Sequence, residues 1–154
     1  MPQLLYHDFN GDGTKELAVI LHIGSGTGVS IRQLHMLREN EYGYFDLANS
    51  VYASNVRNWA LDLIEITECE KSDGFQFTFA GTSFMIDIYR EGAIIGPDVG
   101  NIIDFEFCGA GITVKAAVGA IFDGSPSPVF FGEISAEIEF DGQYFTFTDY
   151  KFNL

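Results

Sequence analysis

The sequence has few basic residues. Only 8 of its 154 residues are Lys or Arg against 22 Asp or Glu, which gives a formal net charge of −14. Nucleic-acid binding needs a basic surface, and attraction to an anionic membrane surface has the same requirement. The charge balance therefore argues against both. An acidic surface keeps a β-rich chain in solution and attracts cations.

Cysteine is equally scarce. Cys69 and Cys108 are the only two, and they do not form the C-x-x-C spacing of zinc or redox sites. Each lies near the end of an apolar stretch, which favours two buried free thiols. A single disulfide between them is the alternative.

Long hydrophobic runs are absent too. A bilayer-spanning helix needs roughly 20 apolar residues, whereas the longest run here, LAVILHI, has the length of a strand. We therefore expect no membrane insertion. The N-terminal residues become polar too early for a secretory signal peptide. Met1 and Pro2 suit an expression start that replaces a longer natural N-terminus.

What the sequence does have is alternation of apolar and polar residues with period two, the pattern of β-strands. We expect residues 16–23 and 29–38 to pair as a hairpin through the GSGTG turn, and Asp141-Gly142 to form a type I′ turn in the last hairpin. The segments predicted as strands are 16–23, 29–38, about 60–68, 75–79, 83–89, 101–107, 111–122 and the two arms of a hairpin within 132–152.

One stretch, residues 45–63, lacks this alternation. Asp46 is placed to N-cap a short helix near 47–58 that carries Leu47 and Val51 on one side. The sequence thus predicts a single mostly β domain over residues 1–154. It would be antiparallel, with about eight or nine strands in a sandwich-like or strongly bent sheet and at most one short helix.

The most informative motif is HDFNGDGTKEL at residues 7–17. Calcium prefers six to eight hard oxygen ligands from a turning loop, contributed by alternate positions. Asp8, Asn10 and Asp12 stand at positions 1, 3 and 5 of such a loop. The backbone carbonyl of Thr14 falls at position 7 and Glu16 at position 9. We predict a calcium site over residues 8–16.

The loop differs from an EF-hand, because its twelfth position is Val19 and a strand follows directly. DFNGDGTKELAVI instead resembles the calcium loop of FG-GAP/VCBS-type repeats, in which D-x-[DN]-x-D-G-x-x-[DE] leads into a hydrophobic strand. The resemblance covers about residues 6–38 and implies calcium at Asp8, Asn10, Asp12, the Thr14 carbonyl and Glu16. Only one copy of the motif is present. The final strands resemble the tails of uncharacterised single-motif proteins from Gram-positive anaerobes.

This resemblance implies a secreted or cell-surface bacterial protein. We expect a non-enzymatic β module in which calcium has a structural role and the partner is an unknown protein or glycan. A metal-free polar turn, shaped by Asx turns and glycines, is the alternative for the loop. The alternative function is a carbohydrate- or peptide-binding module that uses exposed aromatic residues. The candidates for such a surface are Trp59, Tyr42, Tyr44, Tyr52 and Tyr89.

Other residues that often perform chemistry are better interpreted as structural. The GSGTG glycines precede a strand rather than the helix of a nucleotide-binding loop. His22 and His35 are expected to face each other across a hairpin, but no third metal ligand is specified. Glu137 and Glu139 share one strand face and are expected to point to solvent. No nucleophile with a partner base is apparent.

Overall fold

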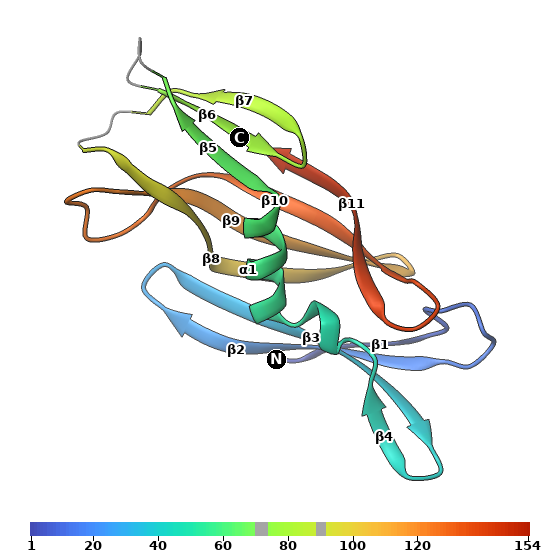
Figure 1. The fold of residues 1–154 in the computed structure, drawn as a ribbon. Helices are drawn as coiled ribbons and strands as arrows, with labels where there is room; N and C mark the ends of the chain where they lie inside the picture. The colour runs from blue at the N-terminus through green and yellow to red at the C-terminus, as the bar shows by residue number, and fades with distance from the viewer. Residues whose placement is uncertain (70–73, 89–91) are drawn as a thin grey trace.

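The computed structural model describes residues 1–69, 74–88 and 92–154, and most of these residues lie in strands, as the sequence predicts. A large curled sheet has the order β1-β2-β3-β8-β9-β10-β11, and β4 pairs with β3 (Figure 1). Its strands are β1 (Gln3–His7), β2 (Glu16–Gly26), β3 (Val29–Asn40), β4 (Gly43–Asp46), β8 (Ile94–Cys108), β9 (Gly111–Phe122), β10 (Val129–Phe140) and β11 (Phe145–Asn153).

A smaller antiparallel sheet has the order β5-β6-β7 and lies beside the end of β11 (Figure 1). Its strands are β5 (Ile64–Glu68), β6 (Phe75–Phe79) and β7 (Thr82–Ile86). The described residues thus contain eleven strands, two more than the upper number expected. One pair is parallel, where β3 meets β8 at Ile31 and Ile103.

The predicted hairpin between residues 16–23 and 29–38 is confirmed as β2 and β3. The two histidines do not face each other, because His35 pairs with Val19 and His22 pairs with Arg32. An irregularity in β2 between His22 and Gly24 shifts the register along the rest of the hairpin. The expected histidine pair is therefore wrong. The same shift also decides which residue of β3 lies opposite Glu16, the first residue of β2.

Period-two alternation correctly identifies the core face of the strands. Phe75, Phe77 and Phe79 of β6 are all buried, and so are Ile103 and Phe105 of β8. The side chains between them are at least partly exposed. The buried residues of both sheets form one connected hydrophobic cluster, which is the core of the domain.

The helix differs from its expected position. A short 3₁₀ helix, η1 (Asn49–Val51), precedes α1 (Ala53–Asp62), which contacts β8 and β3. Asp46 ends β4 and does not cap α1, whose N-cap is Tyr52 and has no side-chain hydrogen bond. The helix therefore begins later and displaces the first residues of the strand expected at about 60–68.

The last hairpin also closes differently. Asp141 to Tyr144 connect β10 and β11, and of this connection only Gly142 has a positive φ, at 105°. The carboxylate of Asp141 accepts the N–H groups of Gln143 and Tyr144, each at 2.8 Å. These bonds hold the pKa of Asp141 below its usual value. A longer, side-chain-stabilised turn thus replaces the predicted two-residue type I′ turn.

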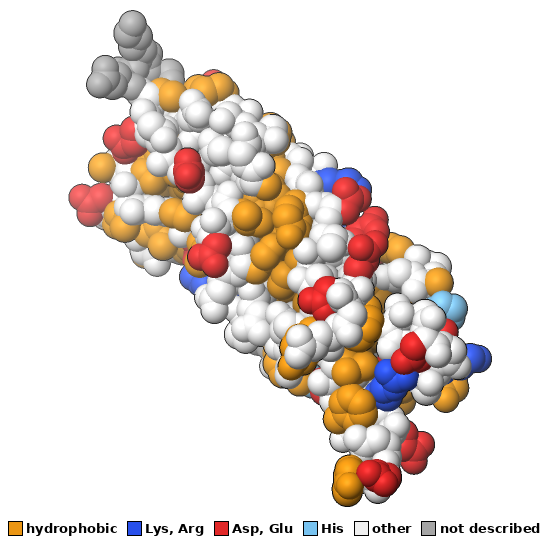
Figure 2. All heavy atoms as spheres, turned by 45° about the vertical axis from the view of Figure 1, so that its right-hand side comes forward, with side chains coloured by type: hydrophobic (Ala, Val, Ile, Leu, Met, Phe, Trp, Pro, Cys, Tyr) orange, Lys and Arg blue, Asp and Glu red, His pale blue; other side chains and the backbone are white. Residues whose placement is uncertain are grey.

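Both cysteines are free thiols, as expected, but they are not both buried. Cys69 is half-buried and Cys108 is exposed, so the expectation that both thiols are buried is wrong. Glu137 and Glu139 point to solvent, as expected. Acidic side chains are spread over the face seen in Figure 2 rather than gathered in one patch.

Within the described ranges, none of the helical segments has the length and apolar character required to cross a bilayer.

The carboxylate of Asp46 forms hydrogen bonds to four residues around the connection between β4 and α1. One carboxylate oxygen accepts the backbone N–H groups of Met36 and Ala48, at 2.8 and 2.9 Å. The other lies 2.7 Å from His35 Nδ1 and 2.7 Å from the Tyr52 hydroxyl. Burial alone would raise the pKa of Asp46, but these hydrogen bonds outweigh burial and lower it. The hydrogen bond to Asp46 raises the pKa of Tyr52 to about 12.

Replacing Tyr52 by phenylalanine is expected to cost about 1 kcal/mol of unfolding free energy at neutral pH, because Asp46 loses a hydrogen-bond donor. A lowered carboxyl pKa contributes stability above its unfolded value of about 4, and this contribution is lost as pH falls through the folded pKa. The difference between variant and wild type should therefore narrow below about pH 4 in thermal melts. Tyr42→Phe, at an exposed position, is the control, and an equal loss there would contradict the assignment.

Candidate metal centre

The predicted calcium loop connects β1 to β2, and its neck is closed by the antiparallel pair His7 and Glu16. Gly11 and Gly13 have φ values of +72° and +86°. Residues with a side chain rarely adopt this left-handed region of φ. The two glycines therefore allow the chain to reverse twice within the loop. The sequence pattern N-G-D-G thus specifies the turn directly.

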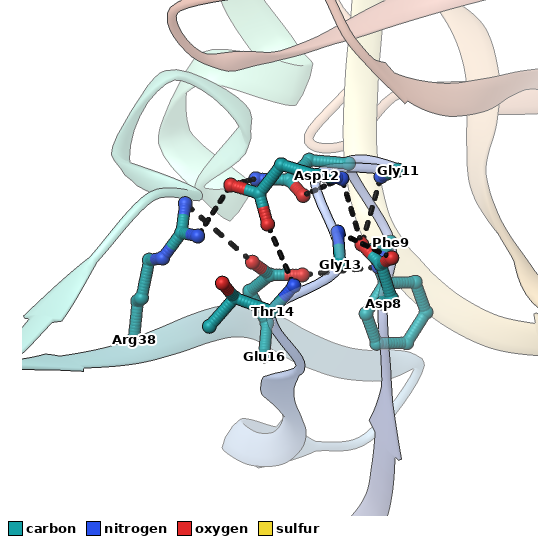
Figure 3. A network of polar contacts seen from close by, with 9 residues as sticks. Asp8, Phe9, Gly11, Asp12, Gly13, Thr14, Glu16 and Arg38 are labelled. Carbon is teal, nitrogen blue, oxygen red and sulfur yellow. Dashed lines mark hydrogen bonds and ion pairs between the residues drawn. The ribbon is translucent and has the colours of Figure 1, made fainter.

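Asp8 is the centre of the loop's backbone hydrogen bonds. Its Oδ1 accepts the N–H of Gly11 at 2.8 Å and that of Asp12 at 3.2 Å. Its Oδ2 accepts the N–H of Gly13 at 2.9 Å. Figure 3 shows these amides converging on the Asp8 carboxylate. A single side chain therefore accepts three backbone N–H groups, and those of Gly11 and Gly13 would otherwise be left to water.

Two Asx turns follow in succession. Asn10 Oδ1 accepts the N–H of Asp12 at 3.1 Å, and Asp12 Oδ1 accepts the N–H of Thr14 at 2.8 Å. The amide of Asn10 also donates to Asp12 Oδ2 at 3.2 Å. Such contacts shape polar turns with or without a metal ion. They bring the side chains at alternate positions to the same part of the loop.

Glu16 was predicted as a ligand, but its complete burial was not predicted. Its Oε2 accepts the backbone N–H of Phe9 at 3.0 Å. Its Oε1 is buried and accepts no hydrogen bond from any residue that the structure describes. Burying a carboxylate oxygen without a donor is costly, so this atom requires a nearby positive charge.

Arg38 of β3 supplies part of that charge. Its Nη1 lies 3.8 Å from Glu16 Oε1, and its Nη2 forms a short ion pair with Asp12 Oδ2. The hydrogen bond from Arg38, followed by the one from Thr14, lowers the pKa of Asp12. Figure 3 shows the guanidinium reaching from β3 toward both carboxylates. Arg38 was not among the residues predicted for the site.

Phe9 anchors the loop to the rest of the domain. Its ring is partly buried and packs against the hydrophobic core. Phe9 and Asn10 also line a shallow pocket with residues of the β9 and β10 ends, including Ile112 and Phe140. The loop is thus attached both to the neck of its own hairpin and to the other end of the large sheet.

The structure brings Asp12 and Glu16 together around Arg38, whereas the carboxylate of Asp8 is turned toward backbone amides. Among residues 1–69, 74–88 and 92–154, three or more His, Cys, Asp and Glu side chains nowhere form a group that would hold a metal ion. The donor types nevertheless suit calcium, since hard oxygens line the loop and one buried carboxylate oxygen lacks a hydrogen-bond donor.

Of the aromatic residues proposed for ligand binding, the described ones do not form one surface. Trp59 of α1 is half-buried and stacks on Phe147, with ring centroids 4.5 Å apart. Tyr52 is bonded to Asp46, and Tyr42 and Tyr44 are exposed in the hairpin of β3 and β4. Tyr89 lies outside the described residues.

Neither a protein-family model, nor a curated protein, nor a solved structure matches the chain.

Proposed function

We propose that the chain is a calcium-binding β module of the FG-GAP/VCBS-like type, non-enzymatic and belonging to a secreted or cell-surface bacterial protein. The observation that carries this proposal is the wholly buried Glu16 carboxylate, whose Oε1 accepts no hydrogen bond from the described residues. This oxygen lies at the end of a loop whose alternate side chains carry oxygen donors. A divalent cation would offset the cost of burying it.

Five groups would hold the ion: the side chains of Asp8, Asn10, Asp12 and Glu16 and the carbonyl of Thr14. When bound, calcium supplies positive charge and flexible coordination by oxygen ligands, and its role in this module is structural. The loop already joins the neck of β1 and β2 to the core through Phe9. Fixing the loop would therefore fix the relative position of the two ends of the large sheet.

Replacing Glu16 by glutamine separates the effect of calcium from the effect of the fold. The amide retains an oxygen for the N–H of Phe9 but loses the negative charge. Without metal, the variant should be as stable as wild type or somewhat more stable, because a buried charge with a long ion pair gains little. With saturating calcium, wild type should become clearly the more stable of the two.

The measurement is thermal melting with and without 10 mM calcium, together with calorimetric titration. Extracellular modules bind calcium at about 10⁻⁴–10⁻³ M. At 10 mM, which is about 10 to 100 times such a Kd, calcium adds about 1.4–2.7 kcal/mol, which corresponds to about 3–10 °C in the Tm of a domain this size. Glu137→Gln, which removes an exposed carboxylate of β10, should respond to calcium as wild type does. A wild-type protein with neither heat of binding nor a Tm change would refute the proposal.

A further inference from the structure

Arg38 approaches the candidate calcium loop from strand β3. Its guanidinium contacts Asp12 and Glu16, the fifth and ninth positions of the loop, from a separate strand. Its side chain is only 21% exposed, so it is not a freely moving surface arginine. The backbone of Arg38 pairs with Phe45 of β4, which fixes where the side chain starts.

The other basic residue close to the loop takes no part in this contact. Lys15 precedes Glu16 in the chain, yet its ammonium lies over the ring of Tyr6, 5.5 Å from the centroid. Asp8, Asp12 and Glu16 therefore place three negative charges on one short loop, and Arg38 is the cation that the structure brings to two of them. Arg38 thus offsets part of the repulsion between these carboxylates in the metal-free loop.

A guanidinium and a calcium ion compete for the same oxygens. Arg38 Nη2 pairs with Asp12 Oδ2, and Nη1 is the cationic group beside Glu16 Oε1. A calcium ion in the loop would need both carboxylates to turn toward it, and it would repel a positive charge held at that distance. Two cations therefore cannot use these oxygens fully at the same time.

We propose that Arg38 is an internal cation that closes the metal-free loop, and that calcium binds by displacing its guanidinium from Asp12 and Glu16. This inference rests on the proposed calcium-binding function and adds its regulation. Because calcium must break the contacts of Arg38 in order to bind, its affinity is lower than it would be without the arginine. The site therefore responds to high calcium concentrations. The released arginine starts from the β3–β4 hairpin, so binding in the loop changes the charged surface beside that hairpin.

The test is calorimetric titration of calcium into wild type, Arg38→Gln, Arg38→Lys and Lys15→Gln. Coupling between two sites or groups commonly changes affinity 5- to 150-fold, and we expect Arg38→Gln to bind calcium about ten-fold more tightly than wild type. Arg38→Lys should lie between the two, because an ammonium cannot contact both carboxylates in the same planar geometry. Lys15→Gln removes the same charge one residue from Glu16 and should change the affinity by less than about two-fold.

Circular dichroism of each variant without calcium will show whether it is folded. A second measurement uses the wild-type chain and depends on no variant: the NMR signals of the Arg38 guanidinium should shift as calcium is added, in proportion to occupancy. Equal or weaker calcium binding by Arg38→Gln, or an unchanged Arg38 signal in calcium-loaded wild type, would overturn the displacement alone. If neither wild type nor any Arg38 variant binds calcium, the proposed function fails with it.

Discussion

Replacement of Phe77 by alanine is expected to lower the free energy of unfolding by about 3–5 kcal/mol, the usual range for truncating a buried aromatic residue. Phe77 is wholly buried and joins the two sheets. Its ring centroid lies 5.2 Å from that of Phe131 on β10 and 4.6 Å from that of Phe152 on β11. The variant would remove the ring through which β6 packs on the large sheet.

Chemical denaturation followed by circular dichroism measures this loss. Phe77→Leu retains most of the buried apolar surface and should cost clearly less, while Phe45→Ala, at an exposed position on β4, should stay within about 0.5 kcal/mol of wild type. A loss below 1 kcal/mol for Phe77→Ala would mean that the small sheet contributes little to the cooperative core. Loss of cooperativity in the variant would show that the β5–β7 sheet unfolds separately.

Most strands were predictable because each buries one face, whereas β1 and β4, which contain no buried residue, were not predicted. In β9 and β10 the alternate residues Ile112, Val114, Ala116, Ile134 and Ala136 are all buried. Such alternation in sequence is a direct consequence of the two-residue period of a strand. It identifies the strands and their core faces, but it contains no information about which strands are neighbours. The parallel contact between β3 and β8 could therefore not be predicted.

The helix and the last turn show how tertiary contacts override local signals. Asp46 has the chemistry of an N-cap, but its carboxylate is already engaged by Met36 of β3 and by Tyr52. The helix consequently begins after Tyr52, at a position with no capping side chain. In the last turn, Asp141 stabilises the loop through its side chain rather than through a positive φ.

The candidate calcium loop was predictable in its local turns but not in its contact with Arg38. The spacing predicted calcium ligands at Asp8, Asn10 and Asp12, with Asx turns as the metal-free alternative; such turns follow from local sequence, because side-chain-to-backbone hydrogen bonds between near neighbours depend on sequence distance. Arg38 was missed because it comes from another strand. An unbroken register from the Gly26–Val29 pair would place Glu39 opposite Glu16, two like charges. The irregularity between His22 and Gly24 shifts the pairing so that Leu17 faces Leu37, and continuing that register brings Arg38 opposite Glu16.

This register shift determines the electrostatic environment of Glu16. With 8 basic residues against 22 acidic ones, most carboxylates must remain in water. Glu16 is an exception, since it is buried and depends on one arginine. Its position is therefore sensitive both to strand register and to any cation that enters the loop.

Replacing Asp8 by alanine should have two separate effects, which add in the presence of calcium. Without metal, the N–H groups of Gly11 and Gly13 lose their acceptor, while that of Asp12 keeps Asn10 Oδ1. Loss of a comparable capping carboxylate costs about 1–2 kcal/mol. With calcium at 100 times the Kd, wild type gains about 2.7 kcal/mol that the variant cannot gain. The total difference should then be about 4 kcal/mol.

Asp8→Asn distinguishes the two effects, because the amide oxygen can still accept from Gly11 and Asp12 while the charge required by calcium is lost. It should retain much of the metal-free stability but little of the calcium response. Asp62→Ala, at an exposed position at the end of α1, controls for the removal of a surface carboxylate. If Asp8→Ala gains as much thermal stability from calcium as wild type does, the ion binds elsewhere on the protein and not in this loop. The loop would then be a polar turn held by its own hydrogen bonds and by Arg38.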